Sequence, residues 1–172
     1  MKIFGICGSL RKNSSNAQLL KAAQIFLNKH RWSSLYLDEL PYFDPDQQFS
    51  EKTPELVKEM RKLASGSDLI LISTPEYAHG VPGLLKNALE WLFCEGTQRK
   101  PAAVIIGSAQ GEYVRDQLSE ILKTMDFVVD AKSFLIVQGA RTKINQEAAF
   151  TDLKAQFEFE SFLSKQVDRR QS

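Results

Sequence analysis

The sequence predicts a doubly wound α/β fold, in which helices cover both faces of a five-stranded parallel sheet. Four apolar runs are short, continuous and rich in branched residues, and they do not alternate with polar residues. Strands that are buried on both faces have this composition. Helical patterns separate the runs, and this regular alternation is the second observation that favours the fold. The four runs are residues 3–7, 68–74, 102–107 and 133–138.

A fifth, weaker strand is expected at residues 32–37, where "WSSLYL" suits an edge position. Five parallel strands in a chain of this length suit the flavodoxin-like order 2-1-3-4-5. Helical patterns between and after the strands predict five helices. The second helix is expected to have Thr53 as its N-cap and Pro54 as its first residue, and to end near Ser65 and Gly66. The others run from about Asn16 to Asn28, from Gly83 to about Phe93, from about Glu112 to Met125, and from about Asn145 to Val167.

Composition limits the possible partners and compartments. The chain has 172 residues and a formal net charge of +1, so we expect one domain over residues 1–172 and neither nucleic acid nor an anionic membrane as a partner. No apolar run approaches the ~20 residues of a membrane span, and a strand that starts at residue 2 leaves no room for a signal peptide. Cys7 and Cys94 belong to no metal-spaced cluster, which predicts reduced thiols in a cytoplasmic protein.

The expected strand order predicts where a ligand would bind. Ligands on open α/β sheets lie at the carboxyl ends of the strands, beside the point where the strand order reverses. In the order 2-1-3-4-5, this point lies between the first and third strands. The loops after Cys7 and after Thr74 should therefore line one crevice, and the loop after Gly107 should close its other side.

The loop of residues 8–16, "GSLRKNSSN", leads from the first strand into the first helix. Free N–H groups and the positive end of the helix dipole favour an anion there. Short polar donors and an arginine, which can pair with phosphate oxygens, add to this preference. They are Ser9, Arg11, Ser14, Ser15 and Asn16. A polar turn with N-capping serines is the alternative interpretation of the same residues.

Three kinds of phosphate site fit this loop poorly. A Walker loop ends in Gly-Lys-Ser/Thr, and no such triplet occurs in the chain. A dinucleotide fingerprint needs three glycines, whereas the loop has only Gly8. A cysteine phosphatase would use Cys7 as nucleophile and Arg11 as clamp, but such enzymes have five residues between the two, and here three intervene. A cysteine at the end of a core strand is also more often a packing residue.

The second loop, "STPEYAHGVPGLLKNALEW" at residues 73–91, contains prolines and a glycine that stiffen the backbone between strand and helix. A planar aromatic ligand on such a loop could meet backbone amides at its edge. Together with "GSLRKNSSN", the pattern TPEYxxGxPGxLKNAxEW resembles the NADPH-dependent FMN reductases, which include flavin, quinone, azo-dye and metal-ion reductases. The resemblance covers residues 1 to about 140. It implies FMN as cofactor and NADPH or NADH as co-substrate.

The resemblance also assigns site residues, position by position. The positions that hold the FMN phosphate correspond to Ser9, Arg11, Ser14, Ser15 and Asn16. Those along the isoalloxazine ring and at the mouth of the site correspond to Pro75, Glu76, Tyr77, Ala78 and Gly80. The stretch "GSAQGEY", residues 107–113, corresponds to the third loop near the pyrimidine end of the ring, with ring contacts expected from Ser108 to Gly111. There the chain departs from the family, because many members have a Gly-Gly pair followed by Arg-Ala, whereas this chain reads Gly111-Glu112-Tyr113-Val114-Arg115.

The implied reaction passes a hydride from nicotinamide to FMN, and electrons then go to a small acceptor such as a quinone, a flavin, an azo compound or a metal ion. The flavin does this chemistry, so no catalytic side chain and no metal ligand is predicted. Glu76 and His79 have the alternative interpretation of solvated loop residues.

Two further expectations concern assembly and alternative functions. The helix at residues 83–93 is apolar on more than one face, which predicts a second subunit against it and a homodimer or homotetramer. An electron-carrier flavodoxin is a less favoured alternative, because the chain lacks a Thr-x-Thr-Gly-x-Thr loop and strong net acidity. A non-enzymatic flavin-binding module is an alternative that the residues alone leave open.

Overall fold

The computed structural model describes residues 1–11 and 13–169. Its centre is a parallel sheet in the order β2-β1-β3-β4-β5, which confirms the predicted doubly wound, flavodoxin-like topology. The strands are β1 (Lys2–Cys7), β2 (Arg31–Ser34), β3 (Leu69–Thr74), β4 (Ala102–Ser108) and β5 (Phe134–Gln138). Strand β2 lies at the edge as expected, and it ends earlier than predicted.

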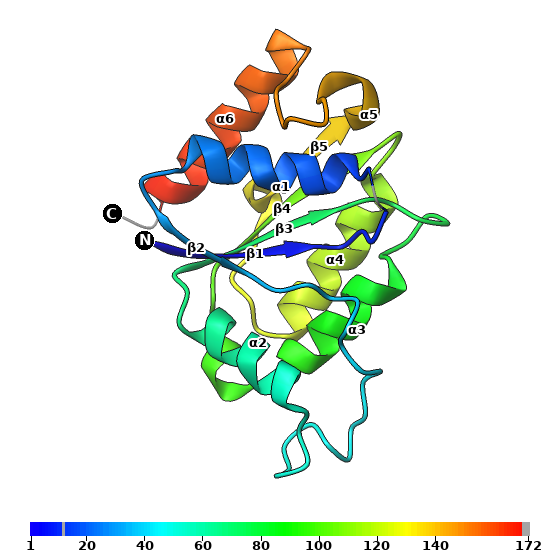
Figure 1. The fold of residues 1–172 in the computed structure, drawn as a ribbon, viewed down its shortest axis with the longest axis vertical. Helices are drawn as coiled ribbons and strands as arrows, with labels where there is room; N and C mark the ends of the chain where they lie inside the picture. The colour runs from blue at the N-terminus through cyan, green and yellow to red at the C-terminus, as the bar shows by residue number, and fades with distance from the viewer. Residues whose placement is uncertain (12, 170–172) are drawn as a thin grey trace.

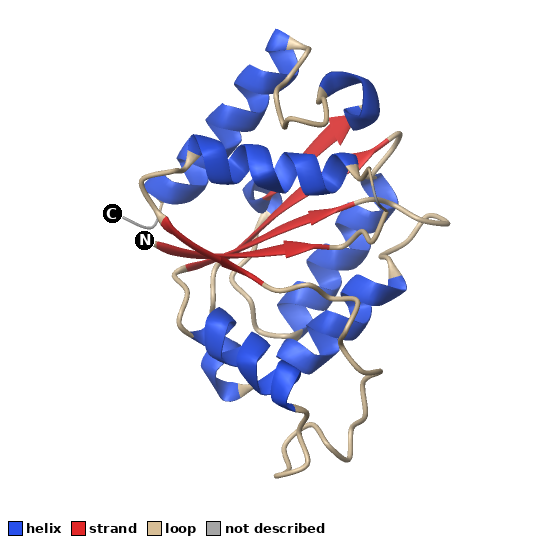
Figure 2. Cartoon of the chain, viewed as in Figure 1, coloured by secondary structure: helices blue, strands red, loops and turns tan. Residues whose placement is uncertain are grey.

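Helices form a layer on each face of the sheet (Figures 1 and 2). One layer contains α1 (Ser15–Phe26), α5 (Ala140–Lys143) and α6 (Leu153–Asp168). The other contains α2 (Glu55–Ser65), α3 (Gly83–Leu92) and α4 (Glu112–Thr124). Two short 3-10 helices lie at Glu95–Thr97 and Ala131–Ser133.

Successive residues of the central strands face opposite helical layers. On β3, Ile70 and Ile72 belong to the core under α2, α3 and α4, whereas Leu69 and Leu71 belong to the core under α1 and α6. All residues of β3 are buried. This burial on both faces explains the continuous apolar runs, and it leaves the strand ends as the place for polar ligand groups.

Helix α2 begins one position later than the sequence predicts. Pro54 is the N-cap, and Glu55 is the first helical residue. The hydroxyl of Thr53, expected to cap the helix, donates instead to the carbonyl oxygens of Gln47 and Ser50, at 2.6 and 2.8 Å. Thr53 therefore closes the preceding loop rather than starting the helix.

The long helix predicted from Asn145 to Val167 is wrong in its first part. The carboxamide oxygen of Asn145 accepts hydrogen bonds from the N–H groups of Glu147 and Ala149, at 3.0 and 2.9 Å, and so forms a local turn. The helix begins only after Asp152, whose carboxylate caps it by accepting from the N–H of Ala155 at 2.8 Å.

Helix α3 is covered on its second apolar face by the chain itself. The segment of residues 35–53 contains neither helix nor strand and loops out beside α2 and α3 (Figure 2). Within it, the ring of Phe43 meets that of Trp91 edge-on at 5.1 Å, and the carbonyl of Pro41 accepts from the indole N–H of Trp91 at 2.9 Å. The apolar second face of α3 is therefore not an argument for a second subunit.

Within the described part of the chain, no helix combines the length and the apolar character that crossing a bilayer requires.

Candidate functional site

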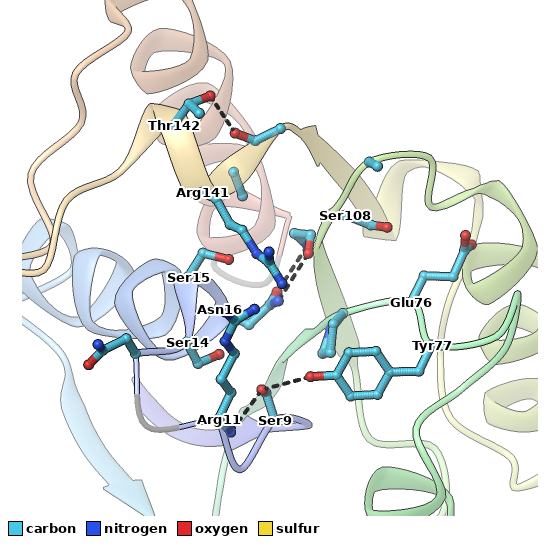
Figure 3. Close-up of a pocket in the computed structure, with 16 residues that line it drawn as sticks. Ser9, Arg11, Ser14, Ser15, Asn16, Glu76, Tyr77, Ser108, Arg141 and Thr142 are labelled. Carbon is cyan, nitrogen blue, oxygen red and sulfur yellow. Dashed lines mark hydrogen bonds between the residues drawn. The ribbon is translucent and has the colours of Figure 1, made fainter.

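A pocket of about 410 Å³ lies where the loops after four strands meet at the carboxyl edge of the sheet (Figure 3). Three of these loops are those that the strand order predicted, and the fourth, after β5, was not anticipated. The lining residues are Ser9, Arg11, Asn13, Ser14, Ser15 and Asn16 after β1; Pro75, Glu76 and Tyr77 after β3; Gly107, Ser108 and Ala109 at the end of β4; and Gly139, Ala140, Arg141 and Thr142 after β5.

One end of the pocket is rich in groups that attract an anion. The side chains of Arg11 and Arg141 extend into it from opposite sides (Figure 3). The first turn of α1 points its N–H groups into the same region and carries no acidic residue. The hydroxyl of Ser14 accepts from the N–H of Ala17 at 3.3 Å and so caps the helix. Both interpretations of the serines thus apply, since the loop is an N-capping turn and also lines a cationic pocket.

Asn16 has a buried side chain that hydrogen-bonds to two strands of the sheet. Its Nδ2 donates to the carbonyl oxygen of Gly107 at 3.0 Å, and its Oδ1 accepts from the N–H of Gly107 at 2.9 Å. The hydroxyl of Ser73 donates to the same Oδ1 at 3.3 Å. The carboxamide oxygen and one of the two carboxamide N–H groups therefore join α1 to β3 and β4.

The other end of the pocket is formed by the segment after β3. Tyr77 is about half exposed, at 49%, and its hydroxyl lies 3.4 Å from that of Ser9, so that the side chain bridges two loops (Figure 3). Pro75 and Glu76 line the pocket beside it.

The carboxylate of Glu76 is not a solvated loop charge. Its side chain is only 6% exposed, and Oε2 accepts a hydrogen bond from the N–H of Val114 at 3.1 Å. Val114 lies in the first turn of α4, where free N–H groups and the helix dipole favour a negative charge. Glu76 thus fastens the loop after β3 to the start of α4.

Three residues expected at the site lie outside the residues that line the pocket: Ala78, Gly80 and Gly111. Gly80 closes a tight turn with Tyr77, and a Cβ on Gly80 would meet Gln117 on α4. Gly111 has a φ of +106° at the N-cap of α4, and a Cβ there would lie 2.9 Å from Ile136. At both positions an added side chain would contact other protein atoms rather than the pocket, so each glycine acts through the shape of its loop.

Arg141 is the charged residue of the pocket lining that the sequence did not predict. It follows β5 in the segment "GAR", residues 139–141, whose Gly139 has a φ of +63°. All carboxyl ends of a parallel sheet meet at one edge, so the loop after the fifth strand was a candidate as well.

Cys7 does not line the pocket. Its thiol donates to the carbonyl oxygen of Ser9 at 3.6 Å, and burial raises the pKa of this thiol. A protonated thiol is a poor nucleophile, so the geometry favours a packing role over a phosphatase mechanism.

Comparison with known proteins shows the family. The family model described as NADPH-dependent FMN reductase matches residues 1–141. The chain belongs to this family. As a member of it, the chain is an NAD(P)H-dependent oxidoreductase that uses FMN.

Individual relatives span most of the chain. It is 32% identical over 142 residues to a quinone reductase of Escherichia coli (strain K12), covering 75% of this chain and 73% of the relative. It is 29% identical over 163 residues to an NAD(P)H:quinone oxidoreductase of Solanum tuberosum, covering 88% and 84%. Among solved structures, the flavoenzyme FerB, an NAD(P)H:(acceptor) oxidoreductase from Paracoccus denitrificans, matches with a TM-score of 0.84 and 27% identity, over 97% of this chain and 95% of that one.

Proposed function

We propose that residues 1–172 form one domain that binds one FMN in this pocket and uses NAD(P)H to reduce a small acceptor, with a quinone as the leading candidate. The cationic end would hold the phosphate, and the end beside Tyr77 would hold the ring. The observation that carries the assignment is that Arg11 and Arg141 both extend into the pocket beside the N-terminus of α1. No acidic residue stands in the first turn of that helix.

The donors of the pocket fit a phosphate monoester. Two guanidinium groups offer charge-assisted hydrogen bonds, and the helix N-terminus offers backbone N–H groups. The hydroxyls of Ser9 and Ser15 are further donors, and Asn16 would contribute its backbone N–H. The carboxylate of Glu76, which also lines the pocket, bonds to Val114 and so opposes an anion less than a free carboxylate would. The volume of about 410 Å³ lies in the usual range for small-molecule sites.

The ring end is suited to position a planar group. The segment from Pro75 to Ala78 would lie along the ring, and Ser108 and Ala109 would approach its edge. Gly80 and Gly111 would act by shaping these loops. Because Glu76 ties the segment to α4, the loops on both sides of the ring are fixed to one another before the cofactor binds.

Bound FMN would supply the hydride and electron chemistry that links NAD(P)H to the acceptor. The protein would hold the phosphate, set the tilt of the ring and leave one ring face open to both substrates in turn. Two of the relatives described above carry quinones in their names, which supports a quinone as acceptor.

The phosphate assignment is tested by comparing FMN with riboflavin, which lacks the phosphate. Arg11→Ala should weaken FMN binding to the apoprotein by about 10- to 150-fold, which corresponds to the roughly 1.5–3 kcal/mol of a charge-assisted hydrogen bond. Riboflavin affinity should stay unchanged. Arg115→Ala is a matched control, since the side chain of Arg115 is 42% exposed and pairs with Asp116 outside the pocket. Equal loss for both flavins, or no loss for FMN, would show that the phosphate lies elsewhere.

We also propose that the enzyme acts in the cytoplasm as a homodimer or homotetramer, on small molecules rather than nucleic acid. Cys7 and Cys94 are both free thiols, which supports a reducing compartment. The assembly rests on the family resemblance, because α3 lends no support. Sedimentation at tens of micromolar would test it, and a monomer at that concentration would contradict it.

A further inference from the structure

We infer that His79 and Tyr113 form a docking shelf for a planar aromatic electron acceptor, beside the ring end of the pocket. The inference rests on the proposed function of the pocket and adds the residues that would select the acceptor. The name "shelf" refers to these two side chains only.

The two rings come from different loops and touch one another. His79 lies in the turn after β3, and Tyr113 lies in the first turn of α4. Their centroids are 4.6 Å apart, with an interplanar angle of 63°, which is an edge-to-face contact. Both remain open to solvent, since the side chain of His79 is 64% exposed and Tyr113 is 55% exposed. Two exposed rings in contact offer apolar area to a third ring.

The turn that carries His79 is held in an unfavourable conformation. Ala78 and His79 have φ values of +49° and +55°, in a region that residues with a Cβ rarely adopt. The turn is closed by two hydrogen bonds, from Tyr77 N to Gly80 O at 3.2 Å and from Gly80 N to Tyr77 O at 2.9 Å. Such strain persists where surrounding contacts impose it, and it is concentrated at functional sites.

The contacts that impose it come from α4, the helix that also carries Tyr113. Gln117 donates through Nε2 to the carbonyl oxygen of His79 at 3.2 Å and accepts through Oε1 from the N–H of Val81 at 3.1 Å. The side chain of Gln117 thus hydrogen-bonds to the turn on both sides of Gly80. The position of His79 relative to Tyr113 is therefore fixed by the fold.

The shelf is joined directly to the pocket wall. Glu76, which lines the pocket, bonds to Val114 next to Tyr113, and its Oε1 lies 3.7 Å from Nδ1 of His79. Tyr77, also in the wall, precedes the strained turn. An acceptor ring above the flavin would thus have the shelf within reach. A compact inorganic acceptor has no flat face to place on it, so the shelf should favour quinones over ferricyanide.

The kinetic test compares these two acceptors in the FMN-loaded enzyme. We expect Tyr113→Ala and His79→Ala each to lower the ratio of kcat/KM for 1,4-naphthoquinone to that for ferricyanide by about 3- to 10-fold, chiefly through a higher KM for the quinone. Tyr113→Phe keeps the ring and should keep the ratio. Tyr36→Ala, at an exposed tyrosine outside the pocket, should keep it as well.

A second test observes binding without turnover. The chain has two histidines, His30 and His79, so each imidazole gives a separate proton signal in NMR spectra, and His30→Gln assigns them. The redox-inert ring 2-naphthol, added to the FMN-loaded enzyme, should shift the His79 signal in the parent and in Tyr113→Phe. The shift should be lost in Tyr113→Ala, and His30 serves as internal reference.

These outcomes separate the shelf from the proposed function. If the parent binds no FMN or oxidises no NAD(P)H, the function itself is wrong. If the parent is active but both alanine variants keep the ratio, or 2-naphthol shifts His79 equally in Tyr113→Ala, the shelf is wrong while the function stands.

Discussion

Replacing Asn16 by alanine should destabilise the protein, although the family resemblance places Asn16 at the phosphate. The carboxamide is the partner of both the N–H and the C=O of Gly107, and it is buried. A buried backbone group that loses its partner costs about 1–3 kcal/mol. The two groups together therefore predict a loss of about 2–6 kcal/mol in the free energy of unfolding.

Urea denaturation of the apoprotein measures this loss. With a denaturant slope of about 2 kcal/mol per molar, a loss near the middle of that range lowers the unfolding midpoint by about 2 M. Ser15→Ala is the matched control, since Ser15 also lines the pocket but makes no such bond to β4, and its midpoint should move little. If Asn16→Ala left the midpoint unchanged and weakened FMN binding more than tenfold, the carboxamide would be a ligand of the phosphate and the structural argument would fail.

Three other predictions concern separate features of the chain. Gly111→Ala should lower the free energy of unfolding by roughly 2–4 kcal/mol, because Gly111 has a φ of +106° and an added Cβ would lie 2.9 Å from Ile136. Gly83→Ala is the control, since a Cβ there meets nothing within 4 Å, and it should change the urea midpoint little. Equal effects of the two substitutions would contradict the reasoning. Cys7 should resist alkylation at pH 8 far longer in the native protein than in urea, because burial raises its pKa; mass spectrometry that found native labelling as fast as unfolded labelling would refute this. The guanidinium of Arg169 and other donors lower the pKa of Asp130. The stability from this exposed pair should therefore be complete above about pH 4 and be lost as the pH falls through the folded-state pKa, with a size below about 1 kcal/mol. Arg169→Ala should flatten that part of the stability curve, and an unchanged acid limb of the curve would show that the pair contributes nothing.

The strands could be predicted because each reports its environment directly. Burial on both faces forces a continuous apolar run, as in residues 69–74. Turn chemistry was harder to read. At Asn145, a side chain that bonds to its own backbone stopped a helix that the apolar spacing of later residues appeared to extend.

The location of the pocket was predictable, because it depends on where the strands end. The loops after β1, β3 and β4 line the pocket because parallel strands end at one edge. What a side chain does once it is there depends on neighbours distant in sequence. Nothing near Asn16 indicates that its amide bonds to Gly107, and nothing near Gly80 indicates that its open side faces Gln117. Likewise, an apolar pattern cannot tell whether α3 is covered by another subunit or by residues 35–53.

The two ends of the pocket are supported by different strands. In the proposed assignment, the loops after β1 and β5 would hold the phosphate and those after β3 and β4 would hold the ring, with the contact between Ser9 and Tyr77 joining the two sets. Substitutions that alter which acceptor is used can therefore accumulate in one pair of loops while selection preserves the other pair. The departure from the family at residues 112–115 lies in the segment after β4, beside the end of the pocket that is assigned to the ring. Acceptor specificity could then change within the family while the affinity for FMN stays the same.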